Sequence, residues 1–391
     1  MPTTTMTDVT LVTDPRFMGG TAQAFRTDVR AFLDAGLRVG LMFFHCGQFF
    51  RATDADNPAL LELLDLPGIE RAPQRTKALF LHNPQIFGAA QLASMDLRLQ
   101  LPSAPRTFIV AHHPPFLGDG ALCYDPLTTT RAINRRLMAR SSLEWLPVSG
   151  LVRHQLNSFQ PLLKLSPEDW PNSFDTEQWQ PSRPRLTGPT LTIGRHGRAD
   201  PAKWPDTAMA IAATLPSAPD IHVRVLGADP AFFAQKGVDT RNWEILPFGS
   251  EPPAAFLDSL DVFSYFHSAQ WREAFGRTVA EAMMMQVPCL LDPELRPTFG
   301  PHALYPRPDD VPAILQQIRS APLPHIDRAT SASKWCRAQF DAQAAASRLG
   351  RLMTTPASRG SLSTDRSRDP LCAARKWIGF QRRLRRQEQL T

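Results

Sequence analysis

Residues 261–291 read DVFSYFHSAQWREAFGRTVAEAMMMQVPCLL. Two short apolar runs, at 261–266 and 288–292, enclose a stretch with helical periodicity at 275–286. Short continuous apolar runs are typical of strands that are buried on both faces of a parallel sheet. The stretch therefore predicts a strand, a crossover helix and a second, parallel strand, which is the repeating unit of an open α/β sheet.

The same alternation runs through most of the chain. Apolar runs bounded by Gly, Pro or Asp predict further strands at 8–13, 38–45, 78–82, 107–112, 144–149, 190–194, 221–227 and 243–248. Between them, helical patterns predict helices at 20–36, 128–140, 203–215, 254–260 and 309–320. Strand–helix alternation on this scale predicts an α/β protein with doubly wound sheets.

The alternation lapses between about 158 and 188, where prolines are frequent and no periodicity is sustained. We therefore expect an N-terminal Rossmann-like domain at 1–170 and a C-terminal Rossmann-like domain at 171–352. An amphipathic helix at 327–352 is expected to close the second domain. Residues 353–391 are expected to form a basic C-terminal tail.

The composition places the chain among soluble globular proteins, with 43% apolar and 20% charged residues. No apolar run approaches the 18–20 residues that a membrane-spanning helix needs. The start, MPTTTMTD, lacks the basic and apolar regions of a secretory signal. Five widely spaced cysteines form no CxxC pair, so neither a disulfide framework nor structural zinc is expected, and a reducing cytoplasm fits; they are Cys46, Cys123, Cys289, Cys336 and Cys372.

The net charge of +6 is concentrated at the C-terminus of the 391-residue chain. Residues 351–391 hold ten Arg or Lys against three Asp or Glu, a balance of +7 that leaves −1 for the other 350 residues. The body of the chain therefore has no bias toward a polyanion, and no nucleic-acid partner is expected. In the tail we expect a flexible linker at 353–370 and a short basic helix at 371–386.

Two glutamates in the opening stretch are suited to hold a ligand. Glu273 lies in the loop after the predicted strand, and Glu281 lies about one and a half turns into the following helix. Carboxylates accept hydrogen bonds from sugar hydroxyls, and the amide groups at 275–278 can hold a phosphate. The neighbours of Glu281 are apolar, so a carboxylate without a partner would be costly there, which favours a bound ligand.

Arg195, Arg198 and Lys203 lie in TIGRHGRADPAKWPD, between the end of a predicted strand and the next helix. Ligands of open α/β sheets bind at this edge. Three cations suit a pyrophosphate, because arginine grips phosphate oxygens with two N–H groups and lysine adds a compact charge. A solvated basic loop is the alternative.

The first predicted strand leads into a Gly-Gly turn, DPRFMGGTAQAF, that opens a helix. Gly19 and Gly20 let the main chain approach a ligand closely, and the amide groups of a helix start favour an anion. An ordinary tight turn is the alternative. The fingerprints GxGxxG and GxxxxGK[ST] are absent from the sequence, which argues against dinucleotide-binding dehydrogenases and P-loop enzymes.

The stretch EAFGRTVAEAM resembles the E-x7-E signature of the retaining glycosyltransferases of family 4, which have the GT-B fold. The Gly-Gly turn, IGRHGR…KWP, VLGAD and LPFG follow in the order of that family. The resemblance covers about 8–350 and is strongest over 189–293. It implies two Rossmann-like domains facing a central cleft. It also implies a hexosyltransferase that moves a sugar, with retention, from a nucleotide-diphosphate sugar to a glycan, lipid-linked or other hydroxyl acceptor.

The resemblance implies a role for each candidate residue. Glu281 would bind the ribose of the donor, and Glu273 the hydroxyls of the transferred sugar. Lys203 and Arg198, with Arg195 as the alternative to Arg198, would neutralise the diphosphate. Other donor-binding positions would be the main chain at Gly19, Gly20, Phe275, Gly276 and Thr278, and Phe248 and Gly249 at the border of the base. Gln286 departs from the family, whose helix ends in Gly, and Gln is a poorer left-handed cap.

A histidine pair follows the predicted strand at 107–112, in TFIVAHHPPF, where the family places a catalytic-site histidine near the acceptor and the donor sugar. His112 and His113 are adjacent, so their side chains diverge on an extended chain and only one can face the cleft; we prefer His112. A structural histidine at a strand end is the alternative, and His82 in FLHNP is a weaker candidate.

No cofactor and no essential metal are expected besides the nucleotide-sugar co-substrate. Asp54 and Asp56 match the DxD pattern of metal-dependent glycosyltransferases of another fold, but they lie in a polar loop where acidity suits the start of a helix. Two other functions compete with sugar transfer. A nucleotide-sugar epimerase of the same fold would turn over its substrate without an acceptor, and a non-catalytic sugar-nucleotide-binding or scaffold subunit would have no need of the pair Glu273 and Glu281.

The predicted basic helix at 371–386 has the composition of an interfacial anchor on an anionic membrane surface, which would place the protein at the inner leaflet. Leu371, Ala374 and Ile378, with Trp377, fall near one helical face. The rest of the surface is mostly basic, with Arg375, Arg382, Arg383, Arg385 and Arg386. The alternatives are a helix that crosses back onto the first domain, a docking face for a partner protein, and a disordered tail.

Overall fold

The computed structural model describes residues 6–47, 49–88, 100–137, 141–160, 162–355 and 370–388. The chain forms two compact units. The first comprises Met1–Phe174 together with Ala342–Thr391, and the second comprises Asp175–Asp341. Residues 342–352, which we expected in the second domain, thus lie in the first unit.

The first unit is built on a parallel sheet with strand order β3-β2-β1-β4-β5-β6. Its described strands are β1 (Thr7–Thr13), β2 (Val39–Phe43), β3 (Ile69–Arg71), β4 (Thr76–His82), β5 (Arg106–Ala111) and β6 (Ser142–Pro147). Its described α-helices are α1 (Gly19–Asp34), α2 (Pro58–Leu61), α4 (Pro126–Asn134), α5 (Gly150–Asn157), α13 (Ala345–Thr354) and α14 (Pro370–Glu388). Successive residues of β4 and β5, such as Leu79 and Phe80, are fully buried, which confirms that these strands are covered on both faces.

One buried carboxylate, that of Asp28, anchors the first part of the proline-rich stretch after α5 by hydrogen bonds. Asp28 of α1 accepts a hydrogen bond from Trp170 Nε1 at 2.8 Å and another from Ser173 Oγ at 2.6 Å. The Trp170 ring packs against Phe32 and Phe80, with ring centroids 6.0 and 4.9 Å apart. The part of this stretch up to Phe174 therefore packs onto the first unit, whereas the part from Asp175 belongs to the second unit, where Arg183 and Arg185 donate hydrogen bonds to Asp258.

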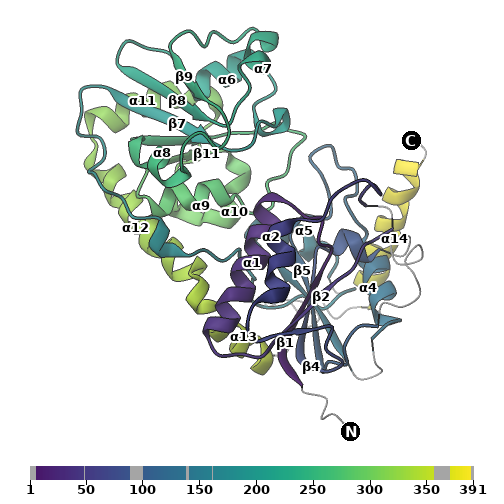
Figure 1. Ribbon diagram of the computed structural model, residues 1–391. Helices are drawn as coiled ribbons and strands as arrows, with labels where there is room; N and C mark the ends of the chain where they lie inside the picture. The colour runs from purple at the N-terminus through teal and green to yellow at the C-terminus, as the bar shows by residue number, and fades with distance from the viewer. Residues whose placement is uncertain are drawn as a thin grey trace. The chain divides into compact units, whose positions relative to one another are not determined.

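The helix expected at 327–352 is two helices in the structure. The chain breaks at Asp341, whose ψ of 130° is extended, so that α12 (Leu323–Phe340) ends in the second unit and α13 begins in the first. In α12, Ser333 donates to the carbonyl of Met284 at 2.9 Å. α13 packs against α1 (Figure 1). The apolar faces of the two halves are thus buried in different units.

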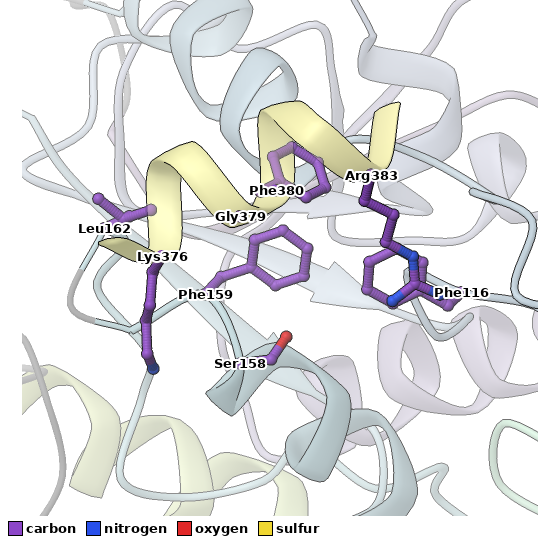
Figure 2. A pocket seen from close by; sticks show the side chains of 8 residues that line it. All are labelled: Phe116, Ser158, Phe159, Leu162, Lys376, Gly379, Phe380 and Arg383. Carbon is purple, nitrogen blue, oxygen red and sulfur yellow. The ribbon is translucent and has the colours of Figure 1, made fainter. Parts of the chain in front are cut away.

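The basic helix α14 packs back onto the first unit. Phe380 meets Phe159 edge-on at 5.0 Å, Arg383 lies over the Phe116 ring at 3.8 Å, and Trp377 lies under Arg131 of α4 at 4.8 Å. Figure 2 shows Phe116, Phe159, Phe380 and Arg383 among the residues that line a cavity, and the volume of this cavity is about 240 Å³. Of the four expectations for the tail, the structure thus has the helix that crosses back. Leu371 and Ile378 are exposed, 65% and 48%, whereas Trp377 faces the protein, so Trp377 does not share their face. Most of the linker expected at 353–370 lies outside the described residues.

The second unit is built on a parallel sheet with strand order β11-β10-β7-β8-β9. Its strands are β7 (Leu191–His196), β8 (Ile221–Leu226), β9 (Trp243–Leu246), β10 (Val262–Tyr265) and β11 (Cys289–Leu291). Its α-helices are α6 (Ala208–Thr214), α7 (Pro230–Lys236), α8 (Pro253–Ser259), α9 (Arg277–Met284), α10 (Arg296–Phe299), α11 (Val311–Ser320) and α12. The helix expected at 203–215 begins only at Ala208, after Thr207 has capped it by accepting from the Ala210 amide at 3.1 Å.

Two observations bear on the chain as a whole. The thiols of Cys46, Cys123, Cys289 and Cys336, which the structure describes, are free. Among the described helices, none is both long enough and apolar enough to cross a membrane.

Candidate active site

The second sheet changes direction between β7 and β10. From β7 the chain continues to β8 and β9 on one side, and β10 and β11 lie on the other side. In open α/β sheets, ligands bind at the carboxyl ends of the strands at such a switch point. β7 ends at His196 and β10 ends at Tyr265, and the predicted site residues follow these two ends in the sequence.

Glu273 lies at the centre of a buried cluster there. Its Oε2 accepts hydrogen bonds from Tyr265 Oη at 2.5 Å, from Lys203 Nζ at 3.0 Å and from Trp271 Nε1 at 3.4 Å. The side chains of Lys203 and Glu273 are only 15% and 13% exposed. The structure thus brings together two residues that the sequence analysis assigned to the diphosphate and the transferred sugar, and adds Tyr265 and Trp271, which it did not name.

The cluster keeps both partners charged at neutral pH. Burial alone would raise the pKa of Glu273, but the Lys203 charge and the Tyr265 and Lys203 hydrogen bonds outweigh it and hold this pKa at about 2. Burial would likewise lower the pKa of Lys203, but Glu273 outweighs it and the pKa lies above its ordinary value. Burial, reinforced by the Glu273 charge, raises the pKa of Tyr265, so its hydroxyl keeps the proton that it donates.

Arg195 is engaged within the protein. Its guanidinium lies between the rings of Trp204 and Tyr265, at 4.1 and 4.5 Å, and donates to the carbonyls of Phe266 at 2.8 Å and Lys203 at 2.7 Å. Burial lowers its pKa to about 10. These contacts fasten the short 3-10 turn that carries Lys203, η4 (Pro201–Lys203), to the end of β10. Arg195 therefore positions Lys203.

Arg198, the other candidate for the diphosphate, lies in the loop before Lys203 and is exposed. Within the described part of the chain its side chain makes no hydrogen bond or ion pair, and its carbonyl accepts from the Asp200 amide at 2.8 Å. Of the two arginines that the sequence left as alternatives, Arg198 is the one whose charge faces solvent.

Glu281 is 9% exposed and has a protein partner. Its Oε2 lies 3.3 Å from Nε2 of His196, and its Oε1 lies 4.0 Å from Nε of Arg277, one turn earlier on α9. The sequence analysis did not single out His196. Because Arg195 and His196 are neighbours on a strand, they point to opposite faces, one toward the Lys203 turn and one toward Glu281.

The start of α9 follows the expected geometry. Gly276 has φ 83°, and a Cβ there would lie 3.2 Å from the Phe299 ring, so both its conformation and its surroundings require glycine. The Phe275 side chain is buried against Phe299 and Phe340, which leaves its main chain as the group that could meet a ligand. Thr278 is half-buried in the first turn. At the other end of the helix, Gln286 adopts the left-handed conformation, with φ 55°.

Phe248 lies at the same edge of the sheet and is 68% exposed. Its ring lies beside Gly227, where a Cβ would come within 3.1 Å of it and within 1.9 Å of the Gly197 carbonyl oxygen. Gly249 follows with φ 80°. The loops after β7 and β8 thus cross closely at Gly197 and Gly227, and the exposed ring of Phe248 lies beside this crossing.

In the first unit, the predicted Gly-Gly turn opens α1. Gly19 and Gly20 are exposed, and Gly19 has φ 66°. The preceding loop is held by Asp14, whose carboxylate binds the Arg16 guanidinium at 2.6 Å and the Cys46 amide at 2.8 Å. The Arg16 and Cys46 contacts outweigh the effect of burial and lower the pKa of Asp14.

The adjacent histidines diverge, as strand geometry predicts. His112 Nε2 lies 3.0 Å from His82 Nδ1, and His113 Nδ1 lies 2.9 Å from Gln85 Nε2. His112 is 5% exposed and His113 is half-buried. His82, which the sequence analysis treated as an alternative to this pair, is fully buried and contacts His112.

Within the described ranges, no group of three or more His, Cys, Asp or Glu side chains is placed to hold a metal ion. Asp56 of the DxD pattern pairs with His45 at 2.7 Å, and Asn57 is the residue that caps the following helix.

The sequence matches no protein-family model and no curated protein. Its fold is similar to solved structures of GT-B proteins. HepE of Anabaena, in complex with UDP, has a TM-score of 0.60 at 14% identity, covering 89% of this chain and 99% of that one. Sucrose-phosphate synthase of Thermosynechococcus elongatus has 0.57 at 15%, covering 89% and 98%. A glycosyltransferase of Rickettsia africae has 0.56 at 12%, covering 89% and 98%. The predicted α/β fold with two Rossmann-like units, GT-B, is thereby confirmed.

Proposed function

We propose that this chain is a glycosyltransferase that moves a sugar from a nucleotide-diphosphate sugar to a hydroxyl acceptor, with retention of configuration. One observation carries the proposal. At the switch point of a GT-B sheet, Lys203 and Glu273 form a buried pair in which each charge keeps the other ionised despite the burial, and Glu281 follows at E-x7-E spacing.

Each charged group has a part in binding the donor. Glu273 accepts hydrogen bonds from hydroxyls of the transferred sugar, and Glu281 accepts from the ribose. Lys203 and Arg198 neutralise the diphosphate, and the main chain at the start of α9 donates to it. Phe248 offers an exposed ring to the base. In the first unit, the Gly19–Gly20 turn offers main-chain N–H groups that suit an anion.

The chemistry that follows is electrostatic. As the bond between the anomeric carbon and the diphosphate oxygen breaks, negative charge grows on the leaving group and positive charge grows on the sugar. Lys203 stays protonated because Glu273 raises its pKa, so it can stabilise the leaving group without a metal ion. We propose that one of the two adjacent histidines, His112 in preference to His113, acts on the side of the transferred sugar and the acceptor.

The donor to test first comes from the structural comparison. Structures of HepE from Anabaena contain UDP, UDP-glucose, or UDP with glucose. We therefore propose UDP-sugars, with UDP-glucose as the first, as donors for this chain, and a glycan or lipid-linked compound as the acceptor.

The outer face of α14 suits an anionic membrane surface. Leu371 and Ile378 are exposed there, together with Arg375, Arg382, Arg385 and Arg386. Exposed apolar side chains amid arginines are the composition of an interfacial helix, and each basic residue near anionic lipid contributes about 1 kcal/mol. We propose that the protein works in the cytoplasm and binds the inner leaflet through this face.

Two substitutions test the donor site by calorimetry. Glu281→Gln is expected to weaken binding of UDP and of UDP-glucose alike, because the ribose is common to both. Glu273→Gln is expected to weaken UDP-glucose and to spare UDP. Equal losses of UDP affinity in both variants would contradict the two assignments.

The reaction itself is followed by NMR with UDP-glucose and a panel of glycan and lipid-linked acceptors. Transfer with the anomeric configuration of the donor is expected. Conversion of the nucleotide sugar in the absence of any acceptor would instead identify an epimerase. Binding without turnover for every donor and acceptor pair would leave a sugar-nucleotide-binding subunit and overturn the proposed transfer.

A further inference from the structure

A short segment after β4 contacts the ends of two other strands of the first sheet. The sheet changes direction between β1 and β4, and this segment lies at that switch point. His82 bonds to His112 after β5, Gln85 bonds to His113, and Asn83 Nδ2 donates to Thr13 Oγ1 of β1 at 3.2 Å. Each of the two candidate histidines, His112 and His113, is therefore bonded to one side chain of this segment.

The side chains of His82 and Gln85 each have one buried polar atom that makes no hydrogen bond within the described part of the chain. These atoms are Nε2 of His82 and Oε1 of Gln85. An orphaned N–H group is rarer in native proteins than an acceptor that lacks a donor. This asymmetry decides which ring nitrogens carry protons.

His82 is neutral, because complete burial lowers its pKa to about 3. A neutral ring has one N–H. If Nε2 carried it, that N–H would be buried without an acceptor. The proton therefore belongs on Nδ1, where it is donated to His112 Nε2. His112 Nε2 is then an acceptor, and the proton of the neutral His112 ring lies on Nδ1.

The same reasoning applies to Gln85. If its amide were turned round, Oε1 would meet His113 and the buried NH2 group would lose its acceptor. With Nε2 donating to His113 Nδ1 at 2.9 Å, only the carbonyl oxygen lacks a donor. His113 Nδ1 is then an acceptor, and the proton of the neutral His113 ring lies on Nε2.

We propose that His82 and Gln85 are positioning residues that hold the adjacent His112 and His113 in opposite tautomers, Nδ1–H in His112 and Nε2–H in His113. Two neighbouring rings then donate through different nitrogens, on different sides of the strand end. The tautomers stand independently of the proposed function. The use of the ring that faces the cleft, as a donor to an oxygen of the transferred sugar or the acceptor, rests on it.

The tautomers are read directly by NMR on the full chain labelled with 15N in the histidine rings, because bare and protonated ring nitrogens have well separated 15N shifts. Signals are assigned with His112→Asn and His113→Asn. At neutral pH we expect a protonated Nδ1 in His112 and a protonated Nε2 in His113. The same tautomer in both rings, or the reverse pair, overturns the proposal without reference to activity.

Two reciprocal substitutions test the cause. His82→Leu is expected to change the nitrogen shifts of His112 and to leave those of His113 unchanged, and Gln85→Leu is expected to do the opposite. His82→Asn places an amide N–H where Nδ1 was and is expected to preserve the His112 tautomer. Loss of that tautomer in the folded Asn variant, or unchanged His112 shifts in the folded Leu variant, would show that His82 does not set it.

Activity gives an independent reading once the donor is known. His82→Leu is expected to lower kcat about tenfold or more while KM stays within about threefold, because a misplaced proton affects the transition state. His82→Asn is expected to recover most of that loss. Wild-type tautomers with no transfer activity in any protein would refute the proposed function and leave the positioning role standing.

Discussion

Lys203 and Glu273 are both largely buried, and each is charged because the other lies 3.0 Å away. Taking one such group alone out of water would shift its pKa toward the neutral form. The pair therefore places a cation, Lys203, and a hydrogen-bond acceptor, Glu273, side by side at the end of a sheet. Arg195, anchored between Trp204 and Tyr265, holds the main chain of Lys203 in place.

Removing a cation from the diphosphate site should slow the chemical step. Lys203→Ala and Arg198→Ala are each expected to lower kcat by about 10²-fold or more, the scale of a preorganised donor to developing negative charge. Arg241→Ala is the control, since Arg241 is exposed and pairs only with the exposed Asp239. Near-normal turnover in both site variants, measured under donor saturation, would remove this loop from the mechanism.

The pair should also give the second unit a distinct acid sensitivity. The pKa of Glu273 is about 2 in the folded protein against an ordinary value of 4.5, so its contribution to stability is complete above 4.5 and is lost as the pH falls toward 2. Glu273→Gln is expected to cost about 3 kcal/mol at pH 7, because it leaves Lys203 buried and unpaired. The gap between wild type and variant should narrow as the pH falls below 4.5.

Urea denaturation at a series of pH values measures that gap. Glu168→Gln serves as the control, because Glu168 pairs with the exposed Arg351 and should cost under about 1 kcal/mol at every pH. The double variant Glu273→Gln, Lys203→Met should regain most of the loss. A gap that is constant from pH 6 to pH 3 would contradict the linkage.

At the level of secondary-structure elements, the apolar runs predicted ten strands and all ten are present. The missed strand, β3, has three residues that are half-buried or exposed, so no apolar run marks it. The helices α5, α7 and α10 were also missed. Each has eight residues or fewer, which is too short for a sustained helical periodicity in the sequence.

The end of α9 shows an element held against its local preference. Gln286 adopts the left-handed conformation, with φ 55°, because the Val287 amide donates to the Ala282 carbonyl at 3.0 Å and closes the cap. The left-handed conformation costs a non-glycine residue about 1–2 kcal/mol of stability. Glycine avoids this cost, but part of the gain is lost because glycine has more conformational entropy in the unfolded chain.

Gln286→Gly is therefore expected to stabilise the second unit by about 0.5–1 kcal/mol in urea denaturation. Gly237→Ala is the matched control. Gly237 has φ 75° at the end of α7 with open space around it, so alanine there should destabilise by a similar amount through conformation alone. Destabilisation by Gln286→Gly would mean that the Gln side chain stabilises this turn.

At the scale of the whole molecule, the C-terminal residues return to the first unit. Two helices do so: α13 packs on α1, and α14 packs on the aromatic side chains Phe116 and Phe159. The positive charge of the chain is thereby carried by the first unit, on the outer face of α14. That face is free of the helix's own packing contacts, which Trp377 and Phe380 make on the opposite side.

A charge-only variant tests the proposed membrane contact. Replacing Arg375, Arg382, Arg385 and Arg386 with Gln keeps Trp377, Phe380 and Arg383 in place. It is expected to weaken co-sedimentation with anionic vesicles about 10³-fold, from about 1 kcal/mol for each charge. Vesicles of neutral lipid should bind neither protein, and high salt should suppress wild-type binding.

A chain that stops after Thr354 is the second comparison for this surface. It lacks α14 altogether, and it should stay in the supernatant with anionic vesicles. Equal pelleting of this chain and the full chain, or binding that ignores salt, would show that α14 is not an electrostatic anchor.

The features that the sequence alone predicted are those that depend on residues close together in the chain. The alternation of apolar runs and helical periodicity predicted the α/β fold with two doubly wound sheets, because burial on both faces leaves a continuous apolar run in a strand. The positions of Glu273, Glu281 and Lys203 after strand ends predicted that they gather at one edge of a sheet. His112 and His113 were predicted to diverge, because side chains alternate along an extended chain.

Only the tertiary structure decided which partner each of these groups meets. Glu281 Oε2 lies 3.3 Å from His196 Nε2, and His112 is hydrogen-bonded to His82, across long separations in the chain. The two arginines of one short motif separate into a buried positioning residue, Arg195, and an exposed charge, Arg198. These contacts depend on the order of the strands and on how the side chains pack. Neither property produces a periodic pattern in the sequence near the residues that make the contacts. The return of α13 and α14 to the first unit has the same cause, because an amphipathic helix specifies its apolar face but not the surface that will cover it.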